Sequence, residues 1–376
     1  MKKIVLAFDS FKGSLTSHEV ARAFIAGVRD VDPAVECHVV AIADGGEGMA
    51  EAVVESVGGE MVAAFAHDPL GRIIEAHYGV IDEGRTAIVP ISSASGITLL
   101  SGDERNPLRA TTYGTGELML DAIKRGCSRI IVGLGGSATN DGGAGLLQAL
   151  GYRFVDADGA ELTTVIDILE RVADILPPAI SPLQGVEVFV AVDVDNPLCG
   201  KRGASYVYGG QKGANAATIE RLDVAMRHYA DVVARWRGSD ISDSEGMGAA
   251  GGAGFAFGAV LGAMPSSGIE LMLSIVDFDN IIADASLVVT GEGRIDRQTV
   301  MGKAPAGVLR HAKRAGVPCI AVGGGVEWCD ELRGSDFDAI YASTPEGMPL
   351  ERAMKKEVAM SNIRSIATAI FKQYVG

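Results

Sequence analysis

The stretch KIVLAFDSFKGSLTSHEVARAFIAGVR, residues 3–29, decides how this chain begins to fold. Its first six residues, Lys3–Phe8, are almost entirely apolar and predict a buried β-strand. Ser17–Arg29 begins with a serine that can cap a helix, and its apolar residues recur at helical spacing. A second strand is expected at Glu36–Ile42 and a second helix at Glu47–Val57. This alternation predicts a parallel sheet that is covered by helices.

The C-terminal part of the chain repeats this alternation. The expected strands and helices are Ser286–Thr290, Ala304–Ala315, Pro318–Val322, Asp338–Ala342 and Leu350–Tyr374. Neither chain end alone has enough strands for a sheet, whereas together they supply about five, a usual number. We therefore predict an α/β fold with a doubly wound, Rossmann-like (flavodoxin-like) domain formed from both chain ends.

The residues between the two ends are expected to form an inserted, mixed α/β domain. The predicted boundaries are 1–61 plus 285–376 for the first domain and 62–284 for the inserted one. The glycine-rich segment Met247–Ser267 is expected to be a buried helix that other backbone approaches closely. Because two connections join the domains, we also expect a hinged cleft between them, where ligands commonly bind.

Composition narrows the classes of function. The chain has 376 residues, a formal net charge of −15 and five cysteines without a C-x-x-C motif. An acidic protein repels phosphate backbones and anionic lipids, so neither nucleic acid nor a membrane is expected as a partner. The scattered cysteines and the absence of a signal-peptide pattern favour free thiols and a cytoplasmic location. The oligomeric state stays open, a homodimer included.

Residues that can carry chemistry follow the predicted strands, at the strand ends where open α/β sheets bind ligands. Most of these loops combine glycine with carboxylates, which hold Mg²⁺ or accept a proton, and several add a lysine for phosphate. The five loops are Asp9–Ser14, Asp44–Gly48, Gly135–Asp141, Val192–Pro197 followed by Gly209–Gly213, and Gly291–Asp296 with Gly302 and Lys303. Single Asp-Gly or Gly-Gly pairs are ordinary turn residues. Their repetition in five loops favours phosphoryl transfer, which needs positioning and charge neutralisation.

The segment GLGGSATNDGGAG, residues 133–145, allows an alternative. Gly133, Gly135 and Ala138 match the dinucleotide fingerprint, and Asp156 stands near the position of a ribose-binding acid. The alternative is an NAD-dependent oxidoreductase of a small hydroxy acid that uses the Gly133–Ala138 loop. However, Asp141 would oppose a pyrophosphate at the start of the following helix. A non-catalytic nucleotide sensor is a third hypothesis, although it leaves the clustered carboxylates unexplained.

Taken in order, the loops resemble the motifs of the bacterial glycerate kinase family, glycerate 2-kinase type. The matching segments run along nearly the whole chain: Asp9–Leu15, Ala43–Gly48, Thr111–Glu117, Gly135–Gly145, Asp193–Leu198, Gln211–Gly213, Ser267–Glu270 and Thr290–Asp296 with Gly302 and Lys303. The resemblance implies ATP-dependent phosphorylation of D-glycerate with Mg²⁺, and 2-phospho-D-glycerate is expected ahead of the 3-phospho product. The chain departs from the family pattern at Met49, at Leu162–Leu169 and at Gly210, which bears on substrate preference.

Roles for individual residues follow from these loops and from the resemblance. The catalytic candidates are Asp193, Asp296, Lys12 and Asp141, with Asp193 or Asp296 as the base. The candidates for binding substrate or phosphate are Ser10, Asp44, Gly45, Gly46, Gly135, Gly136, Ser137, Asn140, Lys212, Arg294 and Lys303. The candidate ligands of Mg²⁺ are Glu47, Asp193 and Glu292.

Overall fold

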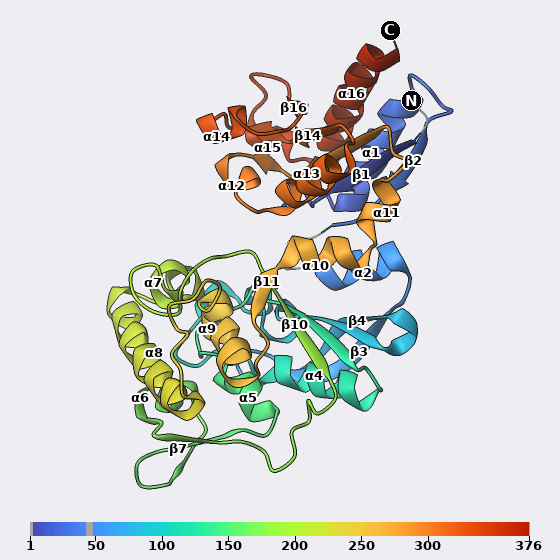
Figure 1. Cartoon of the computed structure of the whole chain (residues 1–376). Coiled ribbons are helices and arrows are strands. Elements are labelled where there is room, and N and C mark those ends of the chain that lie inside the picture. Colours follow the sequence, from blue (N-terminus) through green and yellow to red (C-terminus); the bar gives the residue numbers. More distant parts are fainter. Residues whose placement is uncertain (1–2, 43–47, 376) are drawn as a thin grey trace. The chain divides into compact units, whose positions relative to one another are not determined.

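The computed structural model describes residues 3–42 and 48–375, and the chain divides into two compact units (Figure 1). Unit 1 comprises Met1–Asp44, Glu55–Val57 and Ile269–Gly376, and unit 2 comprises Gly45–Val54 and Gly58–Gly268. The domain boundaries and the cleft expected from the sequence stay predictions.

A parallel sheet built from both ends of the chain forms the centre of unit 1. Its strand order is β16-β14-β12-β1-β2, which confirms the α/β fold expected from the sequence. The strands are β1 (Lys3–Phe8), β2 (Glu36–Val39), β12 (Leu287–Gly291), β14 (Cys319–Gly323) and β16 (Ala339–Ala342). In chain order this is the flavodoxin-like 2-1-3-4-5 arrangement, in which the direction of winding reverses between the first and third strands. The reversal here lies between β1 and β12, whose ends pair Phe8 with Gly291.

Helices cover both faces of this sheet because successive side chains of a strand point to opposite faces. Ile4, Leu6 and Phe8 pack in one apolar cluster with α1 (Ser17–Arg29) and α16 (Lys356–Val375). Val5 and Ala7 pack in another cluster with residues of α10 (Gly268–Ile275), α11 (Phe278–Ile282) and α13 (Ala304–Ala315). The remaining elements of unit 1 are α12 (Arg297–Val300), α14 (Asp330–Arg333), α15 (Leu350–Ala353), β13 (Arg294–Ile295) and β15 (Gly325–Val326).

Unit 2 contains a six-stranded mixed sheet in the order β11-β10-β6-β5-β4-β3. The strands are β3 (Glu60–His67), β4 (Ile73–Ile81), β5 (Thr86–Pro90), β6 (Arg129–Gly133), β10 (Glu187–Val192) and β11 (Pro265–Ser267). The first four in the sheet order are parallel, whereas β4 pairs antiparallel with both β5 and β3. A smaller sheet joins β7 (Arg153–Val155), β8 (Glu161–Leu162) and β9 (Asp174–Leu176).

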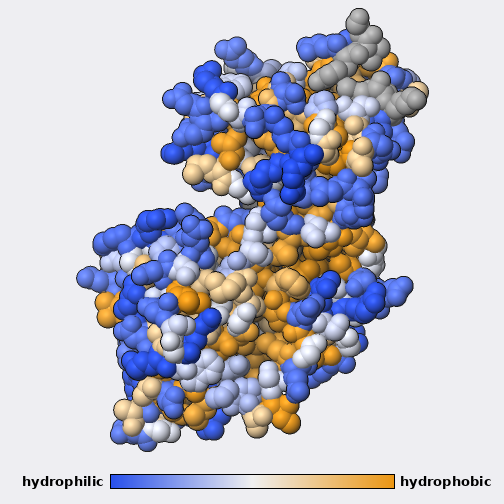
Figure 2. Space-filling view, in the orientation of Figure 1, coloured by the Kyte–Doolittle hydropathy of each residue, from blue (hydrophilic) through white to orange (hydrophobic). Residues whose placement is uncertain are grey.

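Helices pack on the six-stranded sheet through one large apolar cluster. The helices of unit 2 are α2 (Met49–Val57), α3 (Ser92–Ser95), α4 (Tyr113–Lys124), α5 (Ala144–Ala149), α6 (Val165–Arg171), α7 (Ala204–Tyr208), α8 (Ala216–Arg237) and α9 (Ala249–Phe255), of which α2 ends in unit 1. Single turns are η1 (Asp82–Gly84), η2 (Ile97–Leu99), η3 (Gly102–Glu104) and η4 (Gly210–Lys212), and η5 (Ala256–Val260) is a π-helix. In the view of Figure 2, polar residues dominate the surface of unit 1, whereas unit 2 shows polar margins around a broad apolar area.

The glycine-rich segment after Met247 shows why glycine is needed there. A Cβ on Gly251 would stand 2.0 Å from Thr139 O, and one on Gly252 would stand 2.8 Å from Gly142 Cα. The close approach of backbone is therefore confirmed, and the predicted burial is confirmed for residues 247–259 but not for Gly262, Met264 and Ser266, which are exposed. The prediction of one continuous helix was wrong, because Ala250, Gly251 and Gly252 have positive φ values of 51°, 68° and 93°.

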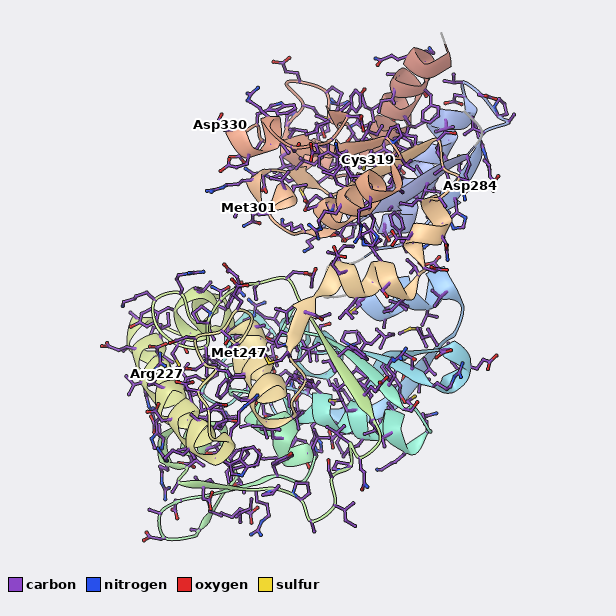
Figure 3. The ribbon with its side chains drawn as sticks, in the orientation of Figure 1. Arg227, Met247, Asp284, Met301, Cys319 and Asp330 are labelled. Carbon is purple, nitrogen blue, oxygen red and sulfur yellow. The ribbon has the colours of Figure 1, made fainter. Side chains whose placement is uncertain are left out.

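All five cysteines are free, and Cys127, Cys199 and Cys319 are buried. Figure 3 labels Cys319 on β14 in unit 1 and Met247, a fully buried residue before α9, in unit 2. Among the residues that the structure describes, no helix is both long enough and apolar enough to span a membrane.

Candidate functional site

The carboxyl edge of the unit 1 sheet holds two buried carboxylates at the point where the winding reverses. Asp9 follows β1 and is 6% exposed, and its Oδ1 accepts a hydrogen bond from Ser10 N at 2.6 Å. Glu292 follows β12 and is 8% exposed. The Thr299 hydroxyl donates to Glu292 Oε1 at 2.7 Å, and Lys303 Nζ lies 3.4 Å from Oε2. Burial raises the pKa of Glu292, and the contacts with Thr299 and Lys303 offset only part of this effect.

The other predicted residues of unit 1 lie in the loops around these carboxylates. Lys12 is exposed in a turn in which Phe11 N donates to Leu15 O at 2.9 Å. Arg294 is exposed and forms an ion pair with Glu327. Asp296 is the N-cap of α12 and accepts from Gln298 N at 2.8 Å, so its carboxylate has a structural task. The predicted residues Asp44, Gly45, Gly46 and Glu47 lie outside the described residues.

The carboxyl edge of the unit 2 sheet brings two predicted loops together. Gly133 ends β6 and pairs with Ala191 on the neighbouring strand β10. Gly135 and Asp193 therefore each lie two residues beyond a matched pair, on strands roughly 4.8 Å apart. Asp193 is exposed, and its Oδ1 accepts a hydrogen bond from Gly268 N at 3.1 Å.

The turn after β6 is pinned on both sides by backbone hydrogen bonds. Ile97 N donates to Gly136 O at 2.8 Å, and Ala138 N donates to Ser95 O at 2.9 Å. Gly136 is exposed and has φ 79°, a conformation that disfavours side chains. The turn thus presents Gly135 and Gly136 at the surface while the residues from Ser137 onward enter the interior.

Lys212 lies behind this turn and is only 3% exposed. Its Nζ donates to Ser137 Oγ at 2.9 Å and to Thr139 O at 2.7 Å. Burial lowers the pKa of Lys212 to about 7, although the nearby Asp141 carboxylate acts in the opposite direction. The structure therefore brings Lys212 into contact with Ser137, 75 positions earlier in the sequence and in the same turn as Gly135.

Asp141 is fully buried and organises the rest of the loop. Its carboxylate accepts from Thr112 N and Oγ1 at 2.7 and 2.8 Å, from Gly143 N at 3.0 Å and from Gly145 N at 3.2 Å. Burial raises the pKa of Asp141 even against these donors. These contacts give Asp141 a structural task, and its expected catalytic role stays a prediction. Because two amides at the start of the short helix α5 are already bound, the geometry offers no support for a pyrophosphate site there.

Asn140 also points into the interior of unit 2. Its Nδ2 donates to Ser205 Oγ at 2.9 Å on α7, whereas its buried Oδ1 has no hydrogen-bond partner within the described part of the chain. The expected contact of Asn140 with substrate stays a prediction.

Comparison with known proteins decides the family. The model of the glycerate kinase family matches residues 4–375. The chain belongs to the glycerate kinase family. It is 42% identical over 372 residues to the glycerate kinase of Bacillus subtilis, covering 98% of this chain and 97% of the relative. It is 44% identical over 323 residues to the glycerate 2-kinase of Escherichia coli K12, covering 86% of this chain and 85% of the relative.

A solved structure agrees with this assignment. A crystal structure assigned as glycerate kinase 2 from Salmonella typhimurium LT2 is 41% identical in sequence. It covers 99% of this chain and 98% of its own, with a TM-score of 0.86. The resemblance that the loop motifs indicated is therefore confirmed at the level of the family and the fold.

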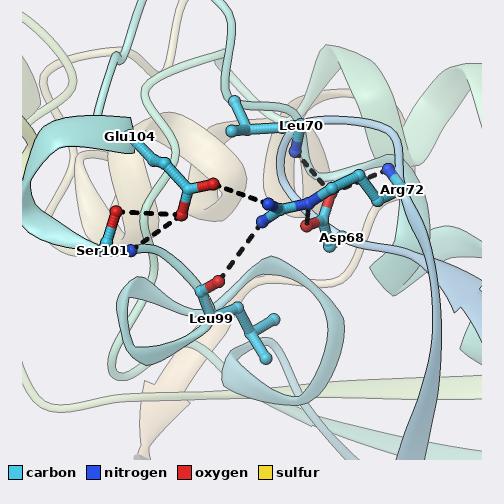
Figure 4. Close-up of polar contacts among 6 residues, drawn as sticks. All are labelled: Asp68, Leu70, Arg72, Leu99, Ser101 and Glu104. Atoms are coloured by element: carbon cyan, nitrogen blue, oxygen red, sulfur yellow. Dashed lines mark hydrogen bonds and ion pairs between the residues drawn. The ribbon is translucent and has the colours of Figure 1, made fainter.

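Sequence reasoning missed one polar network in this glycerate kinase family member. Asp68, 1% exposed, accepts hydrogen bonds from Leu70 N and from Arg72, and Arg72 also contacts Glu104 and Leu99 O (Figure 4). The network holds the segment of residues 97–105 in place. At one end of this segment, Ile97 N donates a hydrogen bond to Gly136 O. At the other end, Arg105 donates to Gln211 O at 3.4 Å, beside Lys212. The sequence feature that could have indicated this network is the turn sequence Asp68-Pro-Leu-Gly-Arg72.

Three or more metal-ligating side chains do not gather at any one point in the described part of the chain. Of the predicted Mg²⁺ ligands, Glu47 is not described, and Glu292 and Asp193 belong to different units. A joint metal site of these residues stays a prediction.

Proposed function

We propose that this protein phosphorylates D-glycerate with ATP, giving 2-phospho-D-glycerate ahead of the 3-phospho product. Membership of the family supports the substrate, and the name of the Escherichia coli relative, glycerate 2-kinase, supports the position of transfer. The observation that carries the proposal is the position of Asp193. Its exposed carboxylate follows β10, directly beside the turn that follows β6.

Asp193 is the proposed general base. The substrate hydroxyl loses its proton to the Asp193 carboxylate as its oxygen attacks the γ-phosphorus of ATP in line with the leaving group. A new oxygen–phosphorus bond forms, the bond to the β,γ-bridging oxygen breaks, and ADP leaves. Asp193 suits this task better than Asp296 because Asp193 is exposed and Asp296 is half-buried, although each carboxylate also accepts a backbone amide at the start of a helix.

Unit 1 is the proposed site of the nucleotide phosphates. Its buried carboxylates, Asp9 and Glu292, lie where the winding of a 2-1-3-4-5 sheet reverses, the usual ligand position in such folds. Lys12, Arg294 and Lys303 are the cations in these loops, and each can offset phosphate charge.

Glu292 would hold Mg²⁺ or its water molecules. Each of its oxygens accepts one polar contact, so the carboxylate keeps acceptor capacity, and a cation would offset the cost of its burial. Magnesium usually needs only one or two protein carboxylates besides phosphate oxygens and water. When bound, the ion would neutralise charge on the transferred phosphoryl group.

The test is to supply ATP, Mg²⁺ and D-glycerate and to identify the product by phosphorus NMR. We expect ADP and 2-phospho-D-glycerate. Asp193→Asn should lower kcat by roughly 100-fold or more while the thermal transition is unchanged. The matched control is Asp195→Asn, because Asp195 is also exposed after β10 but pairs with Arg202 at 3.0 Å.

Two results would contradict the proposal. Absence of turnover with D-glycerate and with other short hydroxy acids would contradict the proposed kinase activity. A normal kcat for Asp193→Asn would remove Asp193 from the mechanism while leaving the function in place.

A further inference from the structure

We infer that the turn Gly135–Ser137 binds the anionic group of the acceptor substrate, and that Lys212 acts on this site by positioning the Ser137 hydroxyl. The inference rests on the proposed function, because it names the part of the substrate that unit 2 holds. The ligand is a small anion, either the carboxylate of the hydroxy acid or the phosphate group of its product.

The backbone amides of the turn are the first observation. In residues 3–42 and 48–375, the N–H groups of Gly135, Gly136 and Ser137 have no protein acceptor. Gly136 has a left-handed conformation, with φ 79°. Successive N–H groups in such turns point toward one side and bind anions. Because Ile97 and Ala138 pin the turn, these donors are fixed before a ligand arrives.

The environment of Lys212 is the second, independent observation. Within the described residues, Lys212 Nζ forms no ion pair within 4.0 Å, although the side chain is 3% exposed. A buried ammonium group is costly when no carboxylate contacts it directly, and a bound anion would reduce this cost beyond the more distant effect of Asp141. The structure gives Lys212 a hydroxyl and a carbonyl oxygen as partners, and the hydroxyl belongs to the turn that carries the unpaired amides.

The effect of Lys212 passes through Ser137 because Lys212 itself is buried. Lys212 Nζ donates to Ser137 Oγ at 2.9 Å, which leaves the serine proton available for a ligand. Of the charged groups around Lys212, Asp141 interacts with it electrostatically, and Arg105 donates to Gln211 O, on the residue before Lys212. Lys212 is therefore a positioning residue. Ser137 is itself only 6% exposed, but it directly follows the exposed Gly136, so its hydroxyl is the side-chain group through which Lys212 would act on a ligand held by the turn.

The neighbouring strand explains why the anion belongs to the acceptor. Asp193, the proposed base, follows β10 beside this turn. An anionic group bound at Gly135–Ser137 would place the rest of a three-carbon hydroxy acid near the Asp193 carboxylate. The same turn would bind a nucleotide phosphate only if unit 2 held the phosphate donor.

The experiment measures binding by calorimetry without nucleotide, using D-glycerate, glycerol and inorganic phosphate as separate ligands. We expect D-glycerate to bind and glycerol, which lacks the carboxylate, not to bind. Ser137→Ala should weaken D-glycerate binding about tenfold or more, the usual effect of a hydrogen bond to a charged group. The control is Ser128→Ala, an exposed serine just before β6, at the opposite end of the same strand.

The outcomes separate the two sources of the anion and the two proposals. Tight binding of phosphate with no binding of D-glycerate would overturn the assignment to the acceptor carboxylate. Equal affinity of wild type and Ser137→Ala for D-glycerate would overturn the site, even where turnover of D-glycerate supports the proposed function. Binding of D-glycerate without turnover would contradict the proposed function but would still support the binding site at Gly135–Ser137.

Lys212 is tested by the pH dependence of binding, which a purely structural role would not change. As the pH rises above about 7, Lys212 becomes neutral and can accept the Ser137 proton, so binding of D-glycerate should weaken. This dependence should be absent in Ser137→Ala, in which the connection to the ligand is lost. The same pH profile in wild type and Ser137→Ala would overturn the role of Lys212.

Discussion

The two sheet edges of this glycerate kinase family member each hold a buried carboxylate, but the two carboxylates have different partners. At the edge of unit 1, Glu292 contacts a lysine and a threonine in its own loop region. At the edge of unit 2, both carboxylate oxygens of Asp141 accept hydrogen bonds from the loop itself: from the amides of Thr112, Gly143 and Gly145 and from the Thr112 hydroxyl. A Gly-rich loop with an aspartate therefore does not reveal whether its carboxylate faces a ligand or holds the backbone.

The largest effect is expected for Asp141→Ala. It leaves buried donors of Thr112, Gly143 and Gly145 without an acceptor, so the protein should lose about 4 kcal/mol or more of unfolding free energy. Urea unfolding followed by circular dichroism measures this loss. A normal unfolding midpoint together with lost turnover would show that Asp141 serves catalysis after all.

Gly251→Ala should have the next largest effect on stability. Its Cβ would stand 2.0 Å from Thr139 O, and its φ is 68°, so both a clash and backbone strain are introduced. We expect a loss of about 3 kcal/mol or more. Gly200→Ala is the matched control, because Gly200 has φ 87° with open space around its Cβ, and it should lose only about 1–2 kcal/mol. Equal losses in urea unfolding would argue against close packing behind the loop.

The stability of unit 2 should depend on pH through Lys212. Its pKa falls from an ordinary value of 10.5 to about 7 in the folded state, so between these values the unfolded chain binds more protons. The contribution of Lys212 therefore becomes more favourable as the pH rises from about 7 to 10. Thermal unfolding at several pH values should show this rise in wild type but not in Lys212→Met. Parallel profiles would mean that Lys212 has an ordinary pKa.

The smallest effect on stability is expected for Glu292→Gln. The amide keeps an acceptor for Thr299, and a neutral group is less costly to bury, so the unfolding free energy should change by less than about 1 kcal/mol. Turnover should nevertheless fall roughly 100-fold if Glu292 supports the phosphates or their metal. An exposed control is Glu331→Gln, which pairs with Arg297 at 2.8 Å and should leave turnover unchanged. Normal activity of Glu292→Gln would contradict its proposed role.

The elements of unit 1 were predictable because their patterns are local. The predicted strand Lys3–Phe8 and the predicted helices Ser17–Arg29 and Ala304–Ala315 match the observed bounds. Their apolar residues fall on one face, and each helix carries a standard end, such as Gly316 ending α13 in the left-handed conformation. The prediction of Ser17 as a cap was wrong by one residue, because the Thr16 side chain accepts from Glu19 N and caps α1. The joining of both ends in one sheet followed from counting strands.

The interior of unit 2 was harder to predict because its determinants are distant contacts. The pairing of Lys212 with Ser137 joins residues 75 positions apart, and Thr139 contacts the backbone near Gly251. The residue types indicated a site, but only the tertiary structure shows that Asp141 is enclosed while Asp193 remains exposed. Asp68 was missed because a turn signature does not show that its aspartate is buried.

The sheet of unit 1 also sets an order of events during synthesis. Strand β1 needs β12 as its neighbour, with Ile4 opposite Leu287, and this partner is translated more than 280 residues later. At about 5–20 residues per second, the ribosome needs roughly 15–60 s to supply it. Throughout that interval one edge of β1 stays unpaired, although all the strands of unit 2 can already have emerged. The nascent chain should therefore depend on chaperones mainly through its first forty residues.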